Sequence, residues 1–228
     1  MNKRFLVILY ICIIVVACHN NNLKKDAGQK TSTPASVRND SNIQKKTILF
    51  FGNSLTAGYG LDPAESFPSL IQEKLDSLHL PFKVINAGVS GETTSGGVGR
   101  IDWILQQPVD IFVLELGAND GLRGIPLNVT QKNLQTIIDK VKSKYSSAKI
   151  VLAGMQIPPN MGPEYTTKFK KIYPELASLN NIKLIPFLLD GVGGNPELNQ
   201  QDGIHPNETG EKIVAENVWK VLRELCKP

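Results

Sequence analysis

The sequence predicts an α/β protein in which helices cover both faces of a parallel β-sheet. Two observations lead to this class. Five short apolar segments are typical of buried strands, and segments with apolar residues at helical spacing lie between them. Strands that alternate with helices form parallel sheets, because right-handed crossovers place the connecting helices on the two sheet faces.

The predicted strands follow one another along the chain. The first, residues 46–52, is an apolar run that ends in glycine. Residues 83–86 form a weaker candidate, residues 110–117 and 148–154 form stronger ones, and residues 182–186 form the last. Continuous apolar runs of this length are expected of strands that are buried on both faces.

Three of the intervening segments predict amphipathic helices. Their apolar positions are Leu70, Ile71, Leu75 and Leu78 in the first segment, Leu134, Ile137, Ile138 and Val141 in the second, and Ile213, Val218, Val221, Leu222 and Leu225 in the third. This spacing places the apolar side chains of each segment on one helix face, which we expect to pack on the sheet.

The first 17 residues predict a secretory signal rather than part of the fold. Lys3 and Arg4 precede an unbroken apolar segment, residues 5–17, which is shorter than the ~20 residues that span a bilayer. Its end, a small residue followed by Cys18, resembles a lipoprotein signal, in which the cysteine is lipidated and becomes the mature N-terminus. The alternative is an ordinary signal peptide or a short membrane anchor. We expect a lipid-anchored protein of the cell envelope, periplasmic or on the outer surface.

Residues 18–45 predict a flexible tether, and residues 46–228 predict one domain. The tether nearly lacks large apolar residues, so it cannot bury enough surface to offset its ordering entropy. Eight of the 25 Lys and Arg residues and two of the 21 Asp and Glu residues precede Thr47, which leaves residues 47–228 with a net charge of −2. No basic patch points to a nucleic-acid partner, and nothing points to a partner helix, so we expect a monomer.

The cysteines predict neither a disulfide framework nor a metal site. Cys12 lies in the signal, Cys18 is the expected lipidation site, and only Cys226 remains, in the last turn of an apparent helix. No Cys and His cluster has metal-ligand spacing. We therefore expect no metal ion and no organic cofactor.

The three histidines leave one candidate for a general base. His19 belongs to the tether, and His79 closes the first predicted helix. His205 remains, and Asp202 three residues earlier can accept a hydrogen bond from its imidazole through the turn at Gly203. The alternative interpretation is a plain Asp-Gly turn before a helix.

Polar loops follow the predicted strands at the edge where parallel sheets collect functional residues. Ser54 follows the first strand, so its N–H can open a helix and point at a developing negative charge. Gly88 permits close backbone approach to a substrate, and Asn119 offers an amide donor. Each loop alone is weak evidence, since glycine and asparagine are common in turns. Together with Asp202 and His205, they predict an acyl-transfer site with Ser54 as the nucleophile.

These loops resemble the four sequence blocks of the GDSL-type, or SGNH, hydrolases. The blocks are FGNSLTAGYG at 51–60, NAGVSG at 86–91, GAND at 117–120 and DGIHPN at 202–207. The resemblance implies a triad of Ser54, His205 and Asp202, and an oxyanion hole formed by Ser54, Gly88 and Asn119. It also implies a three-layer α/β/α sandwich with a five-stranded parallel sheet and flavodoxin-like topology.

Longer strings resemble the bacterial arylesterase, thioesterase and lysophospholipase L1 subgroup: LTAGYG at 55–60, SGETT at 90–94, LELGANDGLRG at 114–124 and GMQIPPN at 154–160. The resemblance implies short to medium acyl esters, aryl esters, thioesters or lysophospholipids as substrates, and an envelope location favours lysophospholipid or an exogenous ester. Met155, Ile157, Pro158 and Met161 would suit an acyl chain, although such residues also pack within loops.

Asn53 departs from the family pattern, because most members have aspartate there. Asparagine keeps the size and the hydrogen bonding but loses the charge, so we expect an active site with altered properties. Two other functions stay open. One is a carbohydrate O-deacetylase, which the same blocks serve. The other is a non-catalytic ligand-binding lipoprotein, against which the intact Ser54, Asp202 and His205 count.

Overall fold

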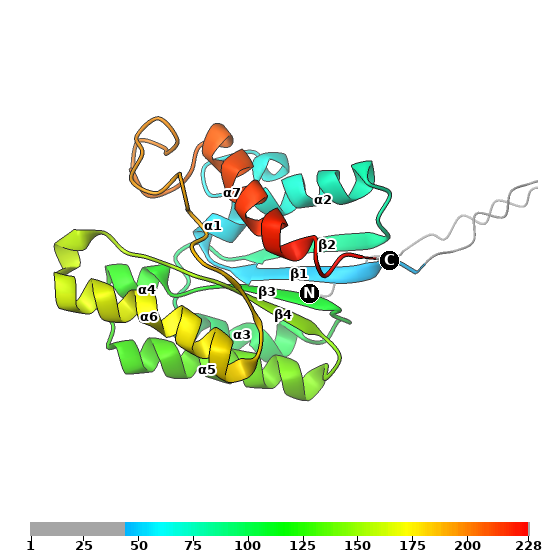
Figure 1. The fold of residues 1–228 in the computed structure, drawn as a ribbon, viewed down its shortest axis with the longest axis horizontal. Coiled ribbons are helices and arrows are strands. Elements are labelled where there is room, and N and C mark those ends of the chain that lie inside the picture. The colour runs from blue at the N-terminus through cyan, green and yellow to red at the C-terminus, as the bar shows by residue number, and fades with distance from the viewer. Residues whose placement is uncertain (1–43, 228) are drawn as a thin grey trace, which may run out of the picture. The chain divides into compact units, whose positions relative to one another are not determined.

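Five parallel strands form the centre of the fold in the computed structural model, which describes residues 44–227 (Figure 1). They are β1 (Lys46–Gly52), β2 (Phe82–Gly88), β3 (Ile111–Glu115), β4 (Lys149–Ala153) and β5 (Lys183–Ile185), in the spatial order β2-β1-β3-β4-β5. This order is that of flavodoxin-like sheets, and it confirms the predicted topology. The predictions for the signal segment, Cys18 and residues 19–43 lie outside the described residues.

Helices cover both faces of the sheet and complete the predicted three-layer sandwich. On one face α2 (Phe67–Ser77) packs beside α7 (Glu208–Leu222), and on the other lie α3 (Thr94–Ile104), α5 (Leu127–Lys144) and α6 (Pro163–Asn180) (Figure 1). None of the helices within residues 44–227 is both long and apolar enough to cross a bilayer.

Two of these helices, α3 and α6, were not found by apolar periodicity. α3 contains Gly96, Gly97 and Gly99, and glycine both weakens the apolar pattern and disfavours helix in isolation. At Gly97 an added Cβ would lie 2.5 Å from the Leu116 side chain, so the helix approaches the sheet closely there. α6 carries an internal Pro174, which ordinarily signals a helix boundary.

The core is built on the three inner strands of the sheet, β1, β3 and β4. Ile48, Leu49, Phe50 and Phe51 of β1 are all fully buried, as expected of a strand covered on both faces.

Cys226 lies beyond α7 rather than in its last turn, so the predicted helical placement is wrong. Burial raises the pKa of its thiol to about 11, which excludes it as a ready nucleophile.

Short elements gather at the carboxyl ends of the strands. They are α1 (Ser54–Ala57), the 3₁₀ helix η1 (Pro63–Glu65), α4 (Ala118–Leu122) and the 3₁₀ helix η2 (Pro159–Met161). The sheet order brings the loops after β1 and β3 next to each other, because these strands are hydrogen-bonded neighbours. The edge that the sequence marked with polar loops is therefore one continuous rim.

Candidate active site

Ser54 is the first residue of α1 and follows β1 after a single intervening residue. That residue, Asn53, caps α1, and its side-chain Oδ1 accepts the N–H of Leu55 at 2.9 Å. The Ser54 residue is 8% exposed and lines a cavity at the rim. Within residues 44–227 no acceptor takes the backbone N–H of Ser54, which leaves this donor free for a ligand.

His205 faces Ser54 although 151 positions separate them in the chain. Its Nε2 lies 2.8 Å from Ser54 Oγ, and its Nδ1 lies 2.6 Å from Asp202 Oδ2. The structure thus brings together the three side chains that the sequence predicted as a triad. In this geometry the imidazole can take the serine proton while the carboxylate fixes the ring tautomer.

Asp202 is held as an anion by its own loop. Its Oδ1 accepts the N–H groups of Ile204 at 2.9 Å and His205 at 3.0 Å, in a turn whose Gly203 has a φ of +71°. Partial burial opposes ionisation, but these backbone donors and the His205 ring together lower the pKa of Asp202 to about 2. The carboxylate is therefore charged at neutral pH.

Hydrogen bonds and a ring contact join the loop that carries His205 to the segment that follows Ser54. Gln200 donates its backbone N–H to His205 O at 2.8 Å, and its side-chain Nε2 to Tyr59 O at 2.7 Å and Pro206 O at 2.9 Å. The Tyr59 ring lies over the His205 ring, with 4.7 Å between their centroids. These contacts set the imidazole against the serine.

Asn119 presents its amide to the same cavity from α4. Its Nδ2 donates one hydrogen to the backbone oxygen of Glu92 at 3.0 Å, and the residue lines the cavity with Ser54. An amide NH₂ has two hydrogens, so one stays available for a ligand. This arrangement suits the predicted role of Asn119 as an oxyanion donor.

The structure does not support Gly88 as the second donor and points instead to Gly91. Gly88 closes β2, does not line the cavity, and donates its N–H to Asn86 Oδ1 at 3.0 Å. Its Cα is packed against α1, because an added Cβ would lie 2.3 Å from Ala57 N. Gly91 lines the cavity, has a φ of +78°, and has no acceptor for its N–H among the described residues. Gly91 belongs to the same NAGVSG block, so the prediction of a donor in this block fits the structure, but its assignment to Gly88 does not.

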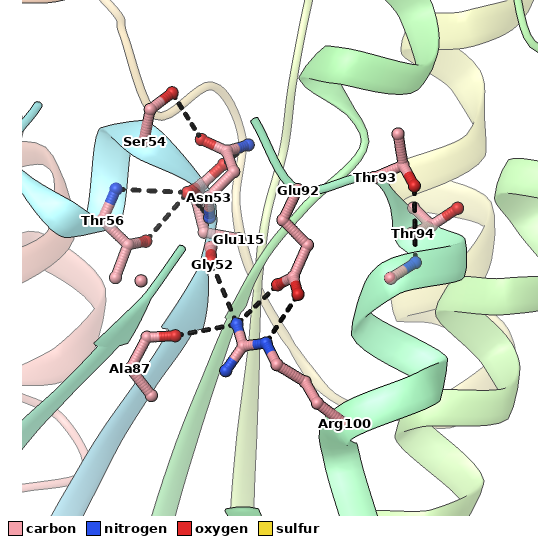
Figure 2. Close-up of polar contacts among 12 residues, drawn as sticks. Gly52, Asn53, Ser54, Thr56, Ala87, Glu92, Thr93, Thr94, Arg100 and Glu115 are labelled. Carbon is pink, nitrogen blue, oxygen red and sulfur yellow. Dashed lines mark hydrogen bonds and ion pairs between the residues drawn. The ribbon is translucent and has the colours of Figure 1, made fainter. Parts of the chain in front are cut away.

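Arg100 of α3, which sequence reasoning did not single out, joins the ends of β1 and β2 to the next loop (Figure 2). Its Nη2 donates to Gly52 O at 3.2 Å and Ala87 O at 2.8 Å, and its Nε donates to Glu92 Oε1 at 2.6 Å. Glu92 O also accepts a hydrogen bond from the Asn119 amide. The ion pair between Arg100 and Glu92 therefore connects the strand end that precedes Ser54 to the loop that holds Asn119.

The cavity beside the triad has a volume of about 470 Å³ and a largely apolar wall. Its larger apolar side chains are Leu55, Tyr59, Leu122, Met155, Ile157, Pro158, Pro159, Phe187, Leu189 and Ile204. Met155, Ile157 and Pro158 were predicted to bind substrate and do line it, whereas Met161 does not. Phe187 and Leu189 come from the loop after β5, where no sequence pattern marked them.

The remaining candidates for chemistry lie elsewhere. His79 is exposed in the turn after α2, at a φ of +54°, and does not line the cavity. Within residues 44–227 no group of His, Cys, Asp and Glu side chains is placed to hold a metal ion.

Comparison with known proteins places this site in context. Residues 50–213 match the model of the GDSL-like lipase/acylhydrolase family. The chain is 38% identical to Esterase TesA of Pseudomonas aeruginosa over 79% of this chain and 89% of that protein. It is 37% identical to thioesterase 1/protease 1/lysophospholipase L1 of Escherichia coli strain K12, over 78% of this chain and 84% of that protein. The crystal structure of the psychrotrophic esterase EstA from Pseudoalteromonas sp., inhibited by monoethylphosphonate, matches with a TM-score of 0.75 and 34% identity, over 79% of this chain and 98% of that one.

Proposed function

The chain belongs to the GDSL-like lipase/acylhydrolase family, and from this premise we propose that it is a serine esterase that hydrolyses carboxylic esters through an acyl-enzyme on Ser54. The observation that carries the proposal is the hydrogen-bonded series Asp202, His205 and Ser54 at the wall of an apolar cavity.

The first step is attack on the ester carbonyl. His205 Nε2 takes the proton of Ser54 Oγ as the oxygen bonds to the carbonyl carbon, and Asp202 stabilises the imidazolium. The negative oxygen of the tetrahedral intermediate accepts hydrogen bonds from the N–H groups of Ser54 and Gly91 and from the Asn119 amide. In other hydrolases the loss of one such donor lowers the rate by ~10²–10³.

The intermediate then collapses: the bond from the carbonyl carbon to the leaving alcohol or thiol breaks, His205 gives its proton to that group, and the acyl chain stays bonded to Ser54 Oγ. In the second step a water molecule loses a proton to His205 and attacks the acyl carbonyl. The bond to Ser54 Oγ breaks, His205 returns the proton to Oγ, and the carboxylic acid leaves. All proton transfers pass through one imidazole, so no metal ion or organic cofactor enters the scheme.

The proposed substrates are short to medium acyl or aryl esters, thioesters and lysophospholipids. The apolar cavity wall supports an acyl chain, because burial of each methylene contributes about 0.8 kcal/mol. The names of the relatives, which include esterase, thioesterase and lysophospholipase, support the same class. A sugar-binding groove with several aromatic rings would favour an O-deacetylase, but Tyr59 and Phe187 are the only aromatic residues on this wall in the described part of the chain.

We propose further that the enzyme acts as a monomer held to an envelope membrane by a lipid on Cys18. The support is the sequence: a charged start, a short apolar segment and a small residue before the cysteine. Detergent phase partition of the full chain tests this. The wild type is expected in the detergent phase, and Cys18→Ser in the aqueous phase or as unprocessed precursor. Equal partition and processing of both chains would contradict lipidation.

Hydrolysis of p-nitrophenyl esters from acetate to palmitate, and of lysophosphatidylcholine, tests the catalytic proposal. The wild type is expected to prefer chains longer than acetate, and Ser54→Ala is expected to have no activity above background. Activity confined to acetate would favour the deacetylase. A folded wild type without activity on any ester would contradict the proposal and favour a ligand-binding role.

A further inference from the structure

Glu115 is a buried acid beneath the Ser54 turn that takes no part in the proposed proton transfers. It ends β3 and is 1% exposed. Its Oε1 accepts the Asn53 Nδ2–H at 2.8 Å, and its Oε2 accepts the Asn53 N–H at 3.0 Å. Oε2 also accepts the Thr56 hydroxyl at 2.8 Å and the Thr56 N–H at 3.3 Å (Figure 2). The carboxylate thus binds the turn at Asn53 and at Thr56, on both sides of Ser54.

The orientation of the Asn53 amide is fixed by a second contact. Its Oδ1 accepts the N–H of Leu55, which is a donor that cannot change its role. A flipped amide would set NH₂ against that N–H and an oxygen against the Glu115 carboxylate. Nδ2 must therefore face Glu115, so Glu115 Oε1 must be an acceptor.

Glu115 is the acceptor in all four of its hydrogen bonds, and two of the four donors are backbone N–H groups. Protonation would add a further O–H to a site already filled with donors. The Thr56 hydroxyl alone can turn to accept it, and it would give up its own bond to Glu115. These donors favour the carboxylate over the carboxylic acid and offset part of the cost of burying its charge.

Gly52 permits this close contact. A Cβ at Gly52 would lie 2.5 Å from Glu115 Oε2 and 2.0 Å from Thr56 Oγ1, so only glycine lets the carboxylate lie against the backbone that precedes the nucleophile. The Glu115 side chain therefore packs against the end of β1 at Gly52, the α1 cap at Asn53 and the first turn of α1 at Thr56.

We propose that Glu115 is a positioning residue whose buried carboxylate, faced by the fixed amide of Asn53, holds the Ser54 turn in its reactive conformation. The inference rests on the proposed nucleophilic role of Ser54. It also gives Asn53 a function. An aspartate there would bring two carboxyl groups to 2.8 Å and require a shared proton, whereas the amide lets Glu115 stay charged without one.

The surroundings of Glu115 bear on its ionisation. Burial raises the pKa of Glu115 from 4.5 to about 7, and the Asn53 and Thr56 donors lower it in part. Glu211 of α7 and Tyr173 of α6 are its electrostatic neighbours. Beyond them, Arg100 of α3 contacts the carbonyl of Gly52, and His205 contacts Ser54.

The test is a reversal of the pair, with kcat, KM and urea unfolding measured for four chains: wild type, Glu115→Gln, Asn53→Asp and the double variant. Glu115→Gln places the new NH₂ against the Asn53 NH₂, so kcat is expected to fall about tenfold or more at nearly constant KM. In the double variant the new carboxylate at position 53 accepts from the new amide at position 115. We expect it to regain most of the kcat and of the stability that Glu115→Gln loses.

Asn53→Asp alone tests the charge. Its two carboxyl groups share one proton at neutral pH, and loss of that proton at higher pH sets two charges together. Its kcat is expected to fall at alkaline pH as this proton is lost, whereas the wild type keeps its rate. An unchanged profile would contradict the inference.

Glu211→Gln is the matched control, because Glu211 is a second buried acid that accepts one backbone N–H, from Phe67. Asn53→Asp is expected not to rescue any defect of Glu211→Gln. Full kcat in Glu115→Gln, or no rescue in the double variant, would overturn the inference. If Glu115→Gln fails to fold, a folded double variant supports the pair and an unfolded one overturns it. Urea unfolding requires no ester turnover, so an inactive wild type would contradict the proposed function alone.

Discussion

His205 Nε2 lies 2.8 Å from Ser54 Oγ, and this contact joins the loop after β1 to the loop before α7. The parallel sheet makes the contact possible because all its carboxyl ends meet at one rim. The bonds from Gln200 to Tyr59 and His205 then fix the distance between the two loops.

Asp202→Asn is expected to lower kcat by about 10⁴ with little change in KM, since the amide favours the wrong imidazole tautomer. Steady-state kinetics on a p-nitrophenyl ester measures this. The low pKa of Asp202, about 2, means that the wild type does not lose this group until well below pH 4. A fall of less than tenfold would show that His205 is oriented by the loop alone.

Gly88→Ala and Gly91→Ala are expected to differ. The first places a Cβ 2.3 Å from Ala57 N and should lower the unfolding temperature. The second meets only the Arg123 side chain, at 3.8 Å, but disfavours the φ of +78° that aims the Gly91 N–H. It should lower kcat more than stability. Thermal unfolding and kinetics on both variants decide, and the opposite pattern would restore Gly88 as the donor.

Stability is expected to fall as pH rises from about 4.5 to about 8 and to level off above it. Burial raises the pKa of Glu115 to about 7 and that of Glu211 to about 8, so both bind protons more tightly in the folded chain than in the unfolded one. Their contribution is complete below about pH 4.5 and is lost through these folded values. Urea unfolding across this range tests it, and Glu211→Gln should show a smaller fall. Stability that rises with pH would contradict the assignment.

Ile157→Trp is expected to shorten the preferred acyl chain. Ile157 lines the cavity together with Met155, and the indole ring of tryptophan at position 157 would fill part of the cavity. The ratio of kcat/KM for acetate to that for octanoate should rise by about tenfold, a change within the 1–3 kcal/mol that a misfit in an apolar pocket is worth. Leu179→Trp, on an exposed surface outside the cavity, is the control. An unchanged ratio would place the acyl chain elsewhere.

Much of this structure could be predicted from the sequence, and the misses have physical causes. β1, β3 and β4 contain continuous apolar runs, β2 and β5 have weaker patterns, and the triad residues follow strands or a marked turn, so local pattern located these elements. α3 was hidden by its glycines and α6 by Pro174.

The misses within the site concern tertiary contacts. The sequence alone does not distinguish Gly88 from Gly91 as the oxyanion donor, and only the packing of α1 against Gly88 does so. Glu115 lies in an apolar run, where the sequence gives no hint that its partners are Asn53 and Thr56. Arg100 likewise acts on carbonyl groups that any residue could provide.

Covalent labelling tests directly whether Ser54 is the nucleophile. The full chain is treated with a fluorophosphonate, and the adduct is located by peptide mass spectrometry in the wild type, Ser54→Ala and His205→Ala. We expect one adduct per wild-type chain on Ser54, none in Ser54→Ala and greatly slowed labelling in His205→Ala. An adduct on another residue, or a folded wild type that is not labelled, would contradict this role of Ser54.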